Sequence, residues 1–203
     1  MMFIVLEGID GSGKSTIAKM LADYLGERGK KVYLTEEPTK TWLGEAVRRG
    51  IEEEKNPYTQ ALLFFADRAE HVMEIKRKIE EGYVVISDRY VYSTYAYQGA
   101  QLYGILRLED AIEWFNKVYE PMRLDPDVVI LLKIDPARGL GFVNTRDFRE
   151  KFEREEFLNR VQEIYDLLAQ SHGFYVVDSN RQIEKVFEDV VGILNPLMFK
   201  NKI

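Results

Sequence analysis

The chain of 203 residues contains no cysteine and only two histidines. It also has no apolar run approaching the ~20 residues of a membrane-spanning helix. The lack of cysteine excludes disulfide bonds, thiolate metal sites and thiol catalysis. Basic residues are in deficit, since 28 Lys and Arg face 34 Asp and Glu, and the net charge of −6 argues against a broad nucleic-acid-binding surface. We therefore expect neither a nucleic-acid polymer nor a membrane as partner, and we expect a local cluster of cations to hold any anionic ligand.

The composition is otherwise that of an ordinary globular protein, with 46% hydrophobic and 31% charged residues. The length suits one α/β domain over residues 1–203. An apolar run begins at residue 2, so we expect no cleavable leader and, together with the lack of cysteine, a cytoplasmic location. The two histidines, His71 and His172, are expected at surface or helix-end positions rather than on a metal ion.

The most informative motif follows this first apolar run: residues 8–15 read Gly-Ile-Asp-Gly-Ser-Gly-Lys-Ser. The run at 2–6 is typical of a buried parallel strand. After the motif, Ile17, Leu21 and Leu25 recur every four residues, and Gly29 closes the pattern, which predicts a helix. A strand, a Gly-x4-Gly-Lys-Ser loop and a helix together are the context of a phosphate-binding loop.

The chemistry of this loop suits a nucleoside triphosphate. Its glycines let backbone N–H groups approach phosphate oxygens, and the helix N-terminus behind them adds partial positive charge. Lys14 is the expected catalytic cation on the β- and γ-phosphates, and the Ser15 hydroxyl is an expected Mg²⁺ ligand. The predicted ATP-binding residues are Gly8, Ile9, Asp10, Gly11, Ser12, Gly13, Lys14, Ser15 and Thr16.

Further apolar runs predict the rest of the fold. Five strands, near 2–6, 31–35, 83–87, 127–134 and 174–177, alternate with segments of helical periodicity near 43–54, 57–81, 107–120, 150–171 and 181–194. This alternation predicts an α/β fold, a five-stranded parallel sheet with helices on both faces. Ligands of such sheets lie at the carboxyl ends of the strands. The loop at 8–15 and the polar segments 36–38 and 88–90 all follow strands, so we expect them to converge on one crevice.

The segment at 88–90, Asp-Arg-Tyr, adds a second charged pair to this crevice. The Asp88 carboxylate at the end of a buried strand is placed to organise Mg²⁺ through its water shell. The Arg89 guanidinium suits a second phosphate, held by two parallel hydrogen bonds. The alternative is an Asp–Arg pair that only closes a turn.

The motifs favour phosphoryl transfer to a small acceptor. The guanine-reading sequence of switch GTPases is missing, because residues 116–119 read Asn-Lys-Val-Tyr and lack the final Asp. No His-Arg-Asp or Asp-Phe-Gly sequence of protein kinases is present. Side chains suited to stacking on a base or bonding its edge are Phe64, Phe65, Arg68, Tyr95, Tyr97 and Gln98. For the two phenylalanines, a place in the core is the competing interpretation.

In this order, the motifs resemble the thymidylate kinase family, P-loop enzymes that make dTDP and ADP from dTMP and ATP with Mg²⁺. The resemblance covers nearly the whole chain, and its carriers are residues 3–16, 36–38, 62–68, 88–93 and 96–100. The phosphate-binding loop alone is shared with many enzymes, whereas the ordered set is far more specific. The resemblance implies a P-loop NTPase fold with a small lid, and a homodimer.

The family's functional residues can be carried over position by position. Asp10 matches the carboxylate that contacts the 3′-hydroxyl of the acceptor sugar. Phe64 matches the ring that stacks on thymine, and Arg68 the guanidinium that bonds a thymine carbonyl oxygen. Arg89 matches the catalytic clamp on the dTMP phosphate, and Asp88 the acid that organises Mg²⁺. The remaining expected substrate contacts are Glu37, Ser93, Thr94, Tyr97 and Gln98, with Tyr97 placed to exclude ribonucleotides.

One variation within the family, the position of the catalytic arginines, is informative. Some members carry an arginine where this chain has Gly11, and others supply arginines from a mobile lid. With Gly11, the resemblance implies a basic lid over about residues 136–153, with Arg146 and Arg149 as catalytic residues. Phe142 stands where the family usually has an arginine, which leaves open which lid arginine acts.

Three alternatives remain open from the sequence. One is another nucleoside monophosphate or deoxynucleoside kinase. The second is a non-catalytic nucleotide-binding regulator whose lid is disabled, for which Phe142 is the motivating feature. The third is a P-loop ATPase that acts on a protein partner and hydrolyses ATP without a monophosphate acceptor. A further phosphate contact from Lys40 or from Arg48 is also undecided.

Overall fold

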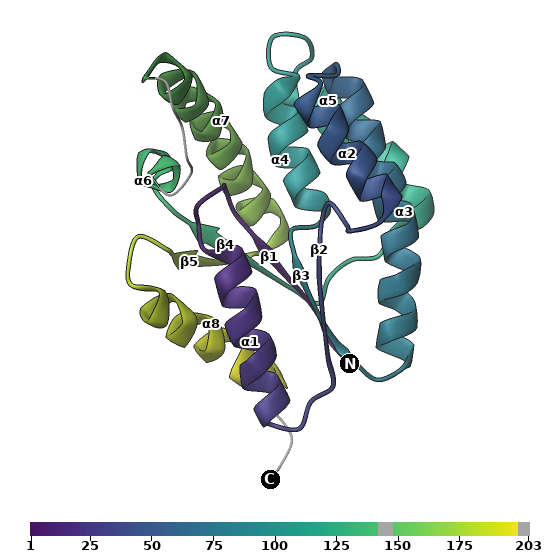
Figure 1. The fold of residues 1–203 in the computed structure, drawn as a ribbon, viewed down its shortest axis with the longest axis vertical. Coiled ribbons are helices and arrows are strands. Elements are labelled where there is room, and N and C mark those ends of the chain that lie inside the picture. Colours follow the sequence, from purple (N-terminus) through teal and green to yellow (C-terminus); the bar gives the residue numbers. More distant parts are fainter. Residues whose placement is uncertain (142–147, 199–203) are drawn as a thin grey trace.

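The computed structural model describes residues 1–141 and 148–198, and for residues 148–153 it describes the backbone alone. Strands and helices alternate along the chain (Figure 1). The strands are β1 (Phe3–Glu7), β2 (Val32–Glu36), β3 (Val84–Asp88), β4 (Val128–Lys133) and β5 (Tyr175–Asp178). The helices are α1 (Lys14–Glu27), α2 (Trp42–Glu52), α3 (Pro57–Glu80), α4 (Val91–Gln101), α5 (Leu108–Tyr119), a 3-10 turn (Glu120–Met122), α6 (Pro136–Leu140), α7 (Phe148–His172) and α8 (Ile183–Met198).

The five strands form one parallel sheet in the order β2-β3-β1-β4-β5. β1 lies at the centre, where Val5 is opposite Ser87 of β3 on one side and Val129 of β4 on the other. The strand order reverses beside β1, so the loop that leaves its carboxyl end opens into the crevice where such sheets bind ligands. The predicted α/β fold class, with a five-stranded parallel sheet, is confirmed.

Successive residues of the central strands point to opposite faces, and each face has its own helical layer. Phe3 and Val5 pack with residues of α3, α4, α5 and α7, whereas Ile4 and Leu6 pack with residues of α1 and α8. Figure 1 shows α1 and α8 together on one side of the sheet. Both faces of β1 are therefore buried, which explains why its sequence is continuously apolar up to Glu7.

Helix α4 is the longest element that the sequence patterns did not predict; the short α6 and the 3-10 turn were missed as well. Its sequence, Val-Tyr-Ser-Thr-Tyr-Ala-Tyr-Gln-Gly-Ala-Gln, has no apolar stripe. The structure gives the reason, because nine of its 11 residues are buried. A helix enclosed on nearly all sides needs no polar face, and periodicity cannot reveal it. The predicted site residues Ser93, Thr94, Tyr97 and Gln98 all lie on this helix.

The segment that the sequence assigned to a lid begins with the short helix α6. The Asp135 carboxylate caps it by accepting hydrogen bonds from the backbone N–H groups of Ala137 and Arg138, at 2.9 and 3.4 Å, and Pro136 occupies its first turn. Residues 142–147 of the predicted lid, Phe142 and Arg146 included, lie outside the described residues. In the described part of the chain, no helix is long and apolar enough to cross a membrane.

Candidate functional site

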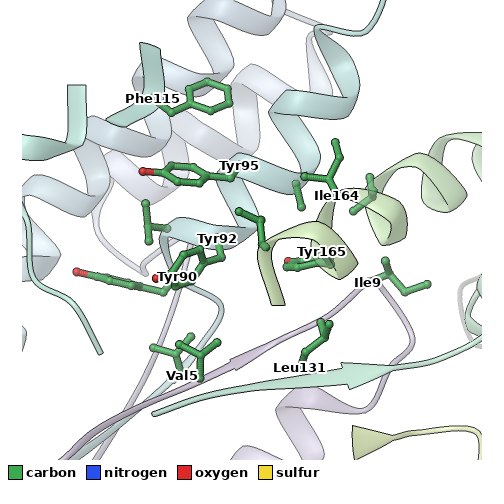
Figure 2. Packing of buried hydrophobic residues seen from close by; sticks show 14 of the residues in the cluster. Val5, Ile9, Tyr90, Tyr92, Tyr95, Phe115, Leu131, Ile164 and Tyr165 are labelled. Atoms are coloured by element: carbon green, nitrogen blue, oxygen red, sulfur yellow. The ribbon is translucent and has the colours of Figure 1, made fainter. Parts of the chain in front are cut away.

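The phosphate-binding loop connects β1 to α1 and wraps around its own lysine. The Lys14 ammonium donates to the carbonyl oxygen of Ile9 at 2.8 Å and to the Ser12 hydroxyl at 3.3 Å. The Ile9 side chain points the other way, into the core (Figure 2). Gly8 has a φ of +145°, and a Cβ there would lie 2.5 Å from the carbonyl oxygen of Leu132. Only glycine fits this position, where the loop passes close to β4.

Two cations lie close together at this loop: Lys14, which is buried, and Arg89, which is partly exposed. Lys14 is 6% exposed, and burial, aided by repulsion from Arg89, lowers the pKa of its ammonium group to about 7. Asp88, Asp10 and Glu7 act in the opposite direction and favour the charged form. Holding Arg89 beside the desolvated Lys14 ammonium is costly, so the arrangement favours an anionic ligand that neutralises both charges.

The two predicted magnesium residues are neighbours in the structure. The Ser15 hydroxyl, on the first turn of α1, donates to Asp88 Oδ2 at 2.5 Å, and Asp88 ends β3. Asp88 is 9% exposed, and its other oxygen, Oδ1, has no hydrogen-bond partner among the described residues. A hydroxyl beside a carboxylate with one free oxygen is a donor set that suits a hard cation such as Mg²⁺.

Arg89 is held in an unusual backbone conformation at the carboxyl end of β3. Its φ is +71°, which is uncommon for a residue other than glycine. Its N–H donates to the carbonyl oxygen of Leu6 at 2.9 Å, and its own carbonyl oxygen accepts from the Ser87 hydroxyl at 2.7 Å. These bonds fix the backbone on both sides, so the guanidinium is aimed back over the loop rather than along the strand.

The Arg89 guanidinium connects the loop to α4. One nitrogen, Nη1, donates to the carbonyl oxygen of Gly8 at 3.0 Å and to Ser93 Oγ at 3.1 Å. The other, Nη2, donates to Asp10 Oδ1 at 2.5 Å and to Tyr97 Oη at 3.3 Å. The Tyr97 hydroxyl in turn accepts from the backbone N–H of Asp10 at 3.0 Å. Burial acts to raise the pKa of Asp10, but Arg89 and Lys14 overcome it and hold that pKa below its usual value.

A second buried cluster surrounds Arg68 on α3. Its guanidinium donates to Glu37 Oε2 through Nε and Nη2, at 3.0 and 2.5 Å, and Nη2 also donates to Thr94 Oγ1 at 2.9 Å. The second oxygen of Glu37 lies 3.0 Å from His71 Nδ1, and His71 Nε2 lies 2.8 Å from the Thr35 hydroxyl. Burial acts to raise the pKa of Glu37, but the charge of Arg68 outweighs it and the pKa is lowered. Both carboxylate oxygens of Glu37 are thus occupied by protein groups, which places this residue behind Arg68.

Two buried polar atoms near this cluster have no hydrogen-bond partner among the described residues. They are Nη1 of Arg68, a donor, and Oε1 of Gln98, an acceptor. Arg68 is 0% exposed and Gln98 is 3% exposed. The Thr94 hydroxyl that holds Arg68 is one turn of α4 away from Gln98, so Arg68 is bonded to α4 next to the turn that carries Gln98. Unpaired buried polar groups are costly, which indicates a ligand that supplies their partners.

The aromatic residues predicted to surround a base fall into two groups. Phe64 is half-buried, whereas Phe65 and Tyr95 are 2% and 3% exposed and belong to the core. Figure 2 shows the Tyr95 ring next to that of Phe115. The two rings are stacked, with centroids 5.6 Å apart. The Tyr95 hydroxyl is bonded to Asn116 at 2.8 Å. Of these three rings, Phe64 therefore remains the candidate for stacking on a base.

Three functional candidates were missed or misjudged in the sequence. The expectation that His71 lies at the surface or at a helix end was wrong, since it is 2% exposed and in the middle of α3. Glu7 is the single charged residue of β1, and that interruption of an apolar strand was the available signal. Arg154 of α7 lies close enough to Asp10 to lower the pKa of its carboxyl. No periodicity marks that arginine, because α7 has many charged residues.

A separate cavity of about 490 Å³ lies on the outer side of the loop. It is bounded by the loop, α6 and the segment after β5, with the lining residues Gly11, Ser12, Gly13, Thr16, Ile134, Arg138, Ser179, Arg181 and Ile183. The Ser179 hydroxyl donates to the carbonyl oxygen of Ser12 at 2.6 Å and fastens the two loops together. The position and size of this cavity suit the nucleoside part of a triphosphate whose phosphates enter the loop.

Helix α6 packs directly on the loop. A Cβ at Gly11, where φ is +82°, would lie 2.3 Å from the carbonyl oxygen of Gly139, and one at Gly139 would lie 2.7 Å from that of Asp10. The two backbones touch because neither residue has a side chain. For the predicted catalytic residue Arg149, the structure places only the backbone, in the first turn of α7.

The undecided pair Lys40 and Arg48 differ clearly. Arg48 donates to the carbonyl oxygens of Pro38 and Thr39 at 3.1 and 2.7 Å, which braces the loop after β2. Lys40 is exposed and forms an ion pair with Glu36 at 3.2 Å. Lys40 also lines a cavity of about 430 Å³ that includes Ser15 and Asp88. A further phosphate contact is therefore more accessible to Lys40.

The fold and this site together define a P-loop enzyme that transfers phosphate between nucleotides. The family model "Thymidylate kinase" matches residues 6–190. Relatives named "Probable thymidylate kinase" include a protein of Staphylothermus marinus, 42% identical over 196 residues that cover 95% of this chain and 94% of the relative. Others come from Pyrobaculum calidifontis, 41% identical with 97% of both chains covered, and Methanococcoides burtonii, 37% identical with 96% of both covered. The chain belongs to the thymidylate kinase family, and the resemblance noted in its sequence is confirmed.

Proposed function

We propose that this chain transfers the γ-phosphoryl group of ATP to dTMP, giving dTDP and ADP. The observation that carries the proposal is the pair of unpartnered buried atoms, Arg68 Nη1 and Gln98 Oε1. The pairing edge of thymine has a ring N–H beside carbonyl oxygens. The N–H can donate to Gln98, and a carbonyl oxygen can accept from Arg68. Cytosine presents an unprotonated ring nitrogen and an amino group at the same edge, and would repel both.

The same pairing edge occurs in uracil, so these two atoms do not separate dTMP from dUMP. Only burial of the thymine methyl group does, and that is worth about 1 kcal/mol. We therefore expect dUMP as a slower substrate. Phe64, half-buried beside Arg68 in the sequence of α3, is our candidate for stacking on the base.

The phosphate groups have separate cationic partners. We assign the β- and γ-phosphates of ATP to the loop and Lys14, and the dTMP phosphate to Arg89. Asp10, bonded to Arg89 at 2.5 Å, is our candidate for the 3′-hydroxyl contact, and Tyr97 is our candidate for packing beneath the sugar. The monophosphate oxygen is already an anionic nucleophile, so a general base is unnecessary, and catalysis consists of positioning and of neutralising charge.

Ser15 and Asp88 are the residues that would hold Mg²⁺. Their 2.5 Å contact and the unpartnered Oδ1 of Asp88 support this assignment. When bound, the ion neutralises charge on the transferring phosphates. Arg154, which acts on Asp10 from α7, adds a described cation to the predicted lid arginines Arg146 and Arg149.

We further propose a homodimer and a cytoplasmic location. Leu62 and Met73 are 49% and 64% exposed, and they lie about three turns apart on the same face of α3. The family resemblance and this exposed face support a second copy as the partner. The lack of cysteine supports a reducing compartment.

The deciding experiment is a coupled ADP-release assay with ATP and Mg²⁺, comparing dTMP, dUMP, dCMP, AMP and no acceptor. Turnover that requires dTMP, with dUMP slower and dCMP inactive, is the expected result. Faster turnover of dCMP or AMP would identify another nucleoside monophosphate kinase. Binding of dTMP without ADP release would favour the non-catalytic regulator, with Phe142 as the place to look.

A further inference from the structure

Glu7 is a buried carboxylate that the proposed chemistry does not use. It is 0% exposed at the carboxyl end of β1, directly before the phosphate-binding loop. Oε1 accepts from the backbone N–H groups of Tyr90 and Ser93, at 3.0 and 3.2 Å. Oε2 accepts from the Ser93 and Tyr165 hydroxyls, at 2.6 and 2.8 Å. Four donors therefore converge on one side chain inside the protein.

Such a group is expensive to bury. Burial raises the pKa of Glu7 to about 7, even though Ser93, Arg89 and Tyr165 favour its charged form. An apolar residue would fill the end of a central strand at lower cost, since unpaired or partly compensated buried charge is destabilising. The function of Glu7 should therefore be sought in what it orients.

The group that it orients is the Ser93 hydroxyl. A hydroxyl has a single proton, and at 2.6 Å that proton is committed to Glu7. The lone pairs of Ser93 Oγ are then left to accept from Arg89 Nη1, 3.1 Å away. Without the carboxylate, this hydroxyl could rotate and present its proton to the guanidinium, which would remove the bond to Arg89.

The second hydroxyl on Glu7 comes from a different element. Tyr165 lies on α7, and Figure 2 shows its ring between that helix and the strands beneath. It is fully buried, and its oxygen is 2.8 Å from both Glu7 Oε2 and Ser93 Oγ. Through Tyr165, α7 therefore contacts the same carboxylate that orients Ser93.

We propose that Glu7 is a positioning residue for the acceptor-phosphate clamp: through Ser93 it fixes Arg89, and through Tyr165 it joins that clamp to α7. This inference rests on the proposed role of Arg89 in holding the dTMP phosphate. Glu7 touches no substrate. Its influence is confined to ligands that carry the phosphate that Arg89 binds.

The test compares dTMP with thymidine, which lacks the phosphate, by calorimetric titration at pH 8. Glu7→Gln should raise the Kd of dTMP about tenfold, as expected for losing roughly one hydrogen bond to a charged group. The Kd of thymidine and that of ATP should change less than about twofold on the same scale. Ser93→Ala should give the same selective loss. The double variant should lose no more than the larger single variant, because both act through one bond.

A matched control comes from α4. Tyr95→Phe removes a buried hydroxyl bond, to Asn116 at 2.8 Å, that is not connected to Glu7, and it should leave the ratio of the dTMP and thymidine constants unchanged. Equal weakening of dTMP and thymidine by Glu7→Gln would mean a merely structural role and overturn the proposal. Additive losses of dTMP affinity in the double variant would overturn it as well. If Glu7→Gln folds poorly, Ser93→Ala is paired with Tyr165→Phe instead, and additive losses in that pair would also overturn the proposal.

Arg89→Ala separates this inference from the function on which it rests. If Arg89→Ala weakens dTMP selectively but Glu7→Gln does not, the clamp is correct and the role of Glu7 is wrong. If Arg89→Ala weakens dTMP and thymidine equally, the assignment of the clamp itself is wrong.

Discussion

The Arg89 guanidinium is bonded to the Asp10 carboxylate at 2.5 Å, so the proposed phosphate clamp is already paired with an anion from the phosphate-binding loop. The Asp10 side chain is half-exposed, so this pair is partly screened by solvent and easily exchanged. An incoming dTMP phosphate would take over part of the guanidinium edge and release Asp10 toward the sugar.

This exchange predicts that Asp10→Asn affects dTMP and its 3′-deoxy analogue differently. The variant should lose about tenfold of the preference for dTMP over its 3′-deoxy analogue, because the charged acceptor of the 3′-hydroxyl is gone. Its affinity for the 3′-deoxy analogue should be unchanged or higher, since Arg89 no longer has a competing anion. Calorimetric titration of both ligands measures the two effects, and an unchanged preference would remove Asp10 from the sugar site.

Lys14→Ala should abolish phosphoryl transfer while leaving dTMP binding largely intact. The ammonium is enclosed by the loop, bonded to Ile9 and Ser12, and lies apart from the Arg68 cluster that we assign to thymine. Loss of a preorganised cation at the transferring group should reduce kcat by a factor of about 10³ or more. Single-turnover kinetics together with dTMP titration are the measurement. Retained turnover would show that the assignment of the phosphate-binding loop is wrong.

Gln98→Leu should weaken dTMP about tenfold without weakening ATP, and without a large loss of stability. Oε1 of Gln98 has no partner in the described protein, and the bond lost on the other side of the amide, from Nε2 to Gln101 Oε1, is a long, part-buried one of 3.4 Å. Gln162→Leu is the matched control, because Gln162 also has a buried unpartnered Oε1, yet its amide is bonded to Asp166 at 3.2 Å, a residue outside the proposed site. If both variants weaken dTMP equally, Gln98 does not read the base.

Arg68→Ala is less suited to this purpose, although it should weaken dTMP more than ATP. Removing the guanidinium leaves Glu37, 5% exposed, as a buried charge whose remaining side-chain partner among the described residues is His71. Breaking a buried ion pair in this way costs about 3–5 kcal/mol. Thermal denaturation would show this loss, and a stable Arg68→Ala variant would contradict the pairing that we describe.

The raised pKa of Glu7 predicts that the free energy of unfolding falls as pH rises. The folded protein binds a proton on Glu7 with a pKa of about 7, whereas the ordinary value is 4.5. The contribution is therefore fully present below pH 4.5 and is lost as pH rises through 7. Between pH 5 and pH 8 the change is about 2–3 kcal/mol. Chemical denaturation of the wild type and of Glu7→Gln should show the wild type losing this much relative to the variant; parallel pH profiles would contradict it.

The sequence predicted helices that have one apolar and one polar face, and strands that are apolar along their whole length. β1, β3 and β4 read as strands because both faces are buried, and the loop at 8–15 fixed the orientation of the first helix. α4 escaped because burial on nearly all sides removes the periodicity by which helices are recognised.

The site residues fall into two groups, those that the sequence could identify and those that it could not. Residues that follow strands, such as Lys14, Asp88 and Arg89, were identifiable because parallel strands end at one edge. The residues behind them were not. His71 reaches Glu37, and Glu7 reaches Ser93, only after α3 and α4 have packed on the sheet. Such partners are distant in sequence, and no local pattern in a single chain records the contact.

The touching backbones of Gly11 and Gly139 have an evolutionary consequence. An arginine introduced at residue 11 would drive its first carbon into the carbonyl group of residue 139, 2.3 Å away. The loop arginine of some family members and the close seat of α6 seen here are therefore mutually exclusive. A lineage, or an engineer, could not exchange one arrangement for the other by a single substitution. Helix α6 would have to move away from the loop first, so the residue at position 11 and the position of α6 should change together in evolution.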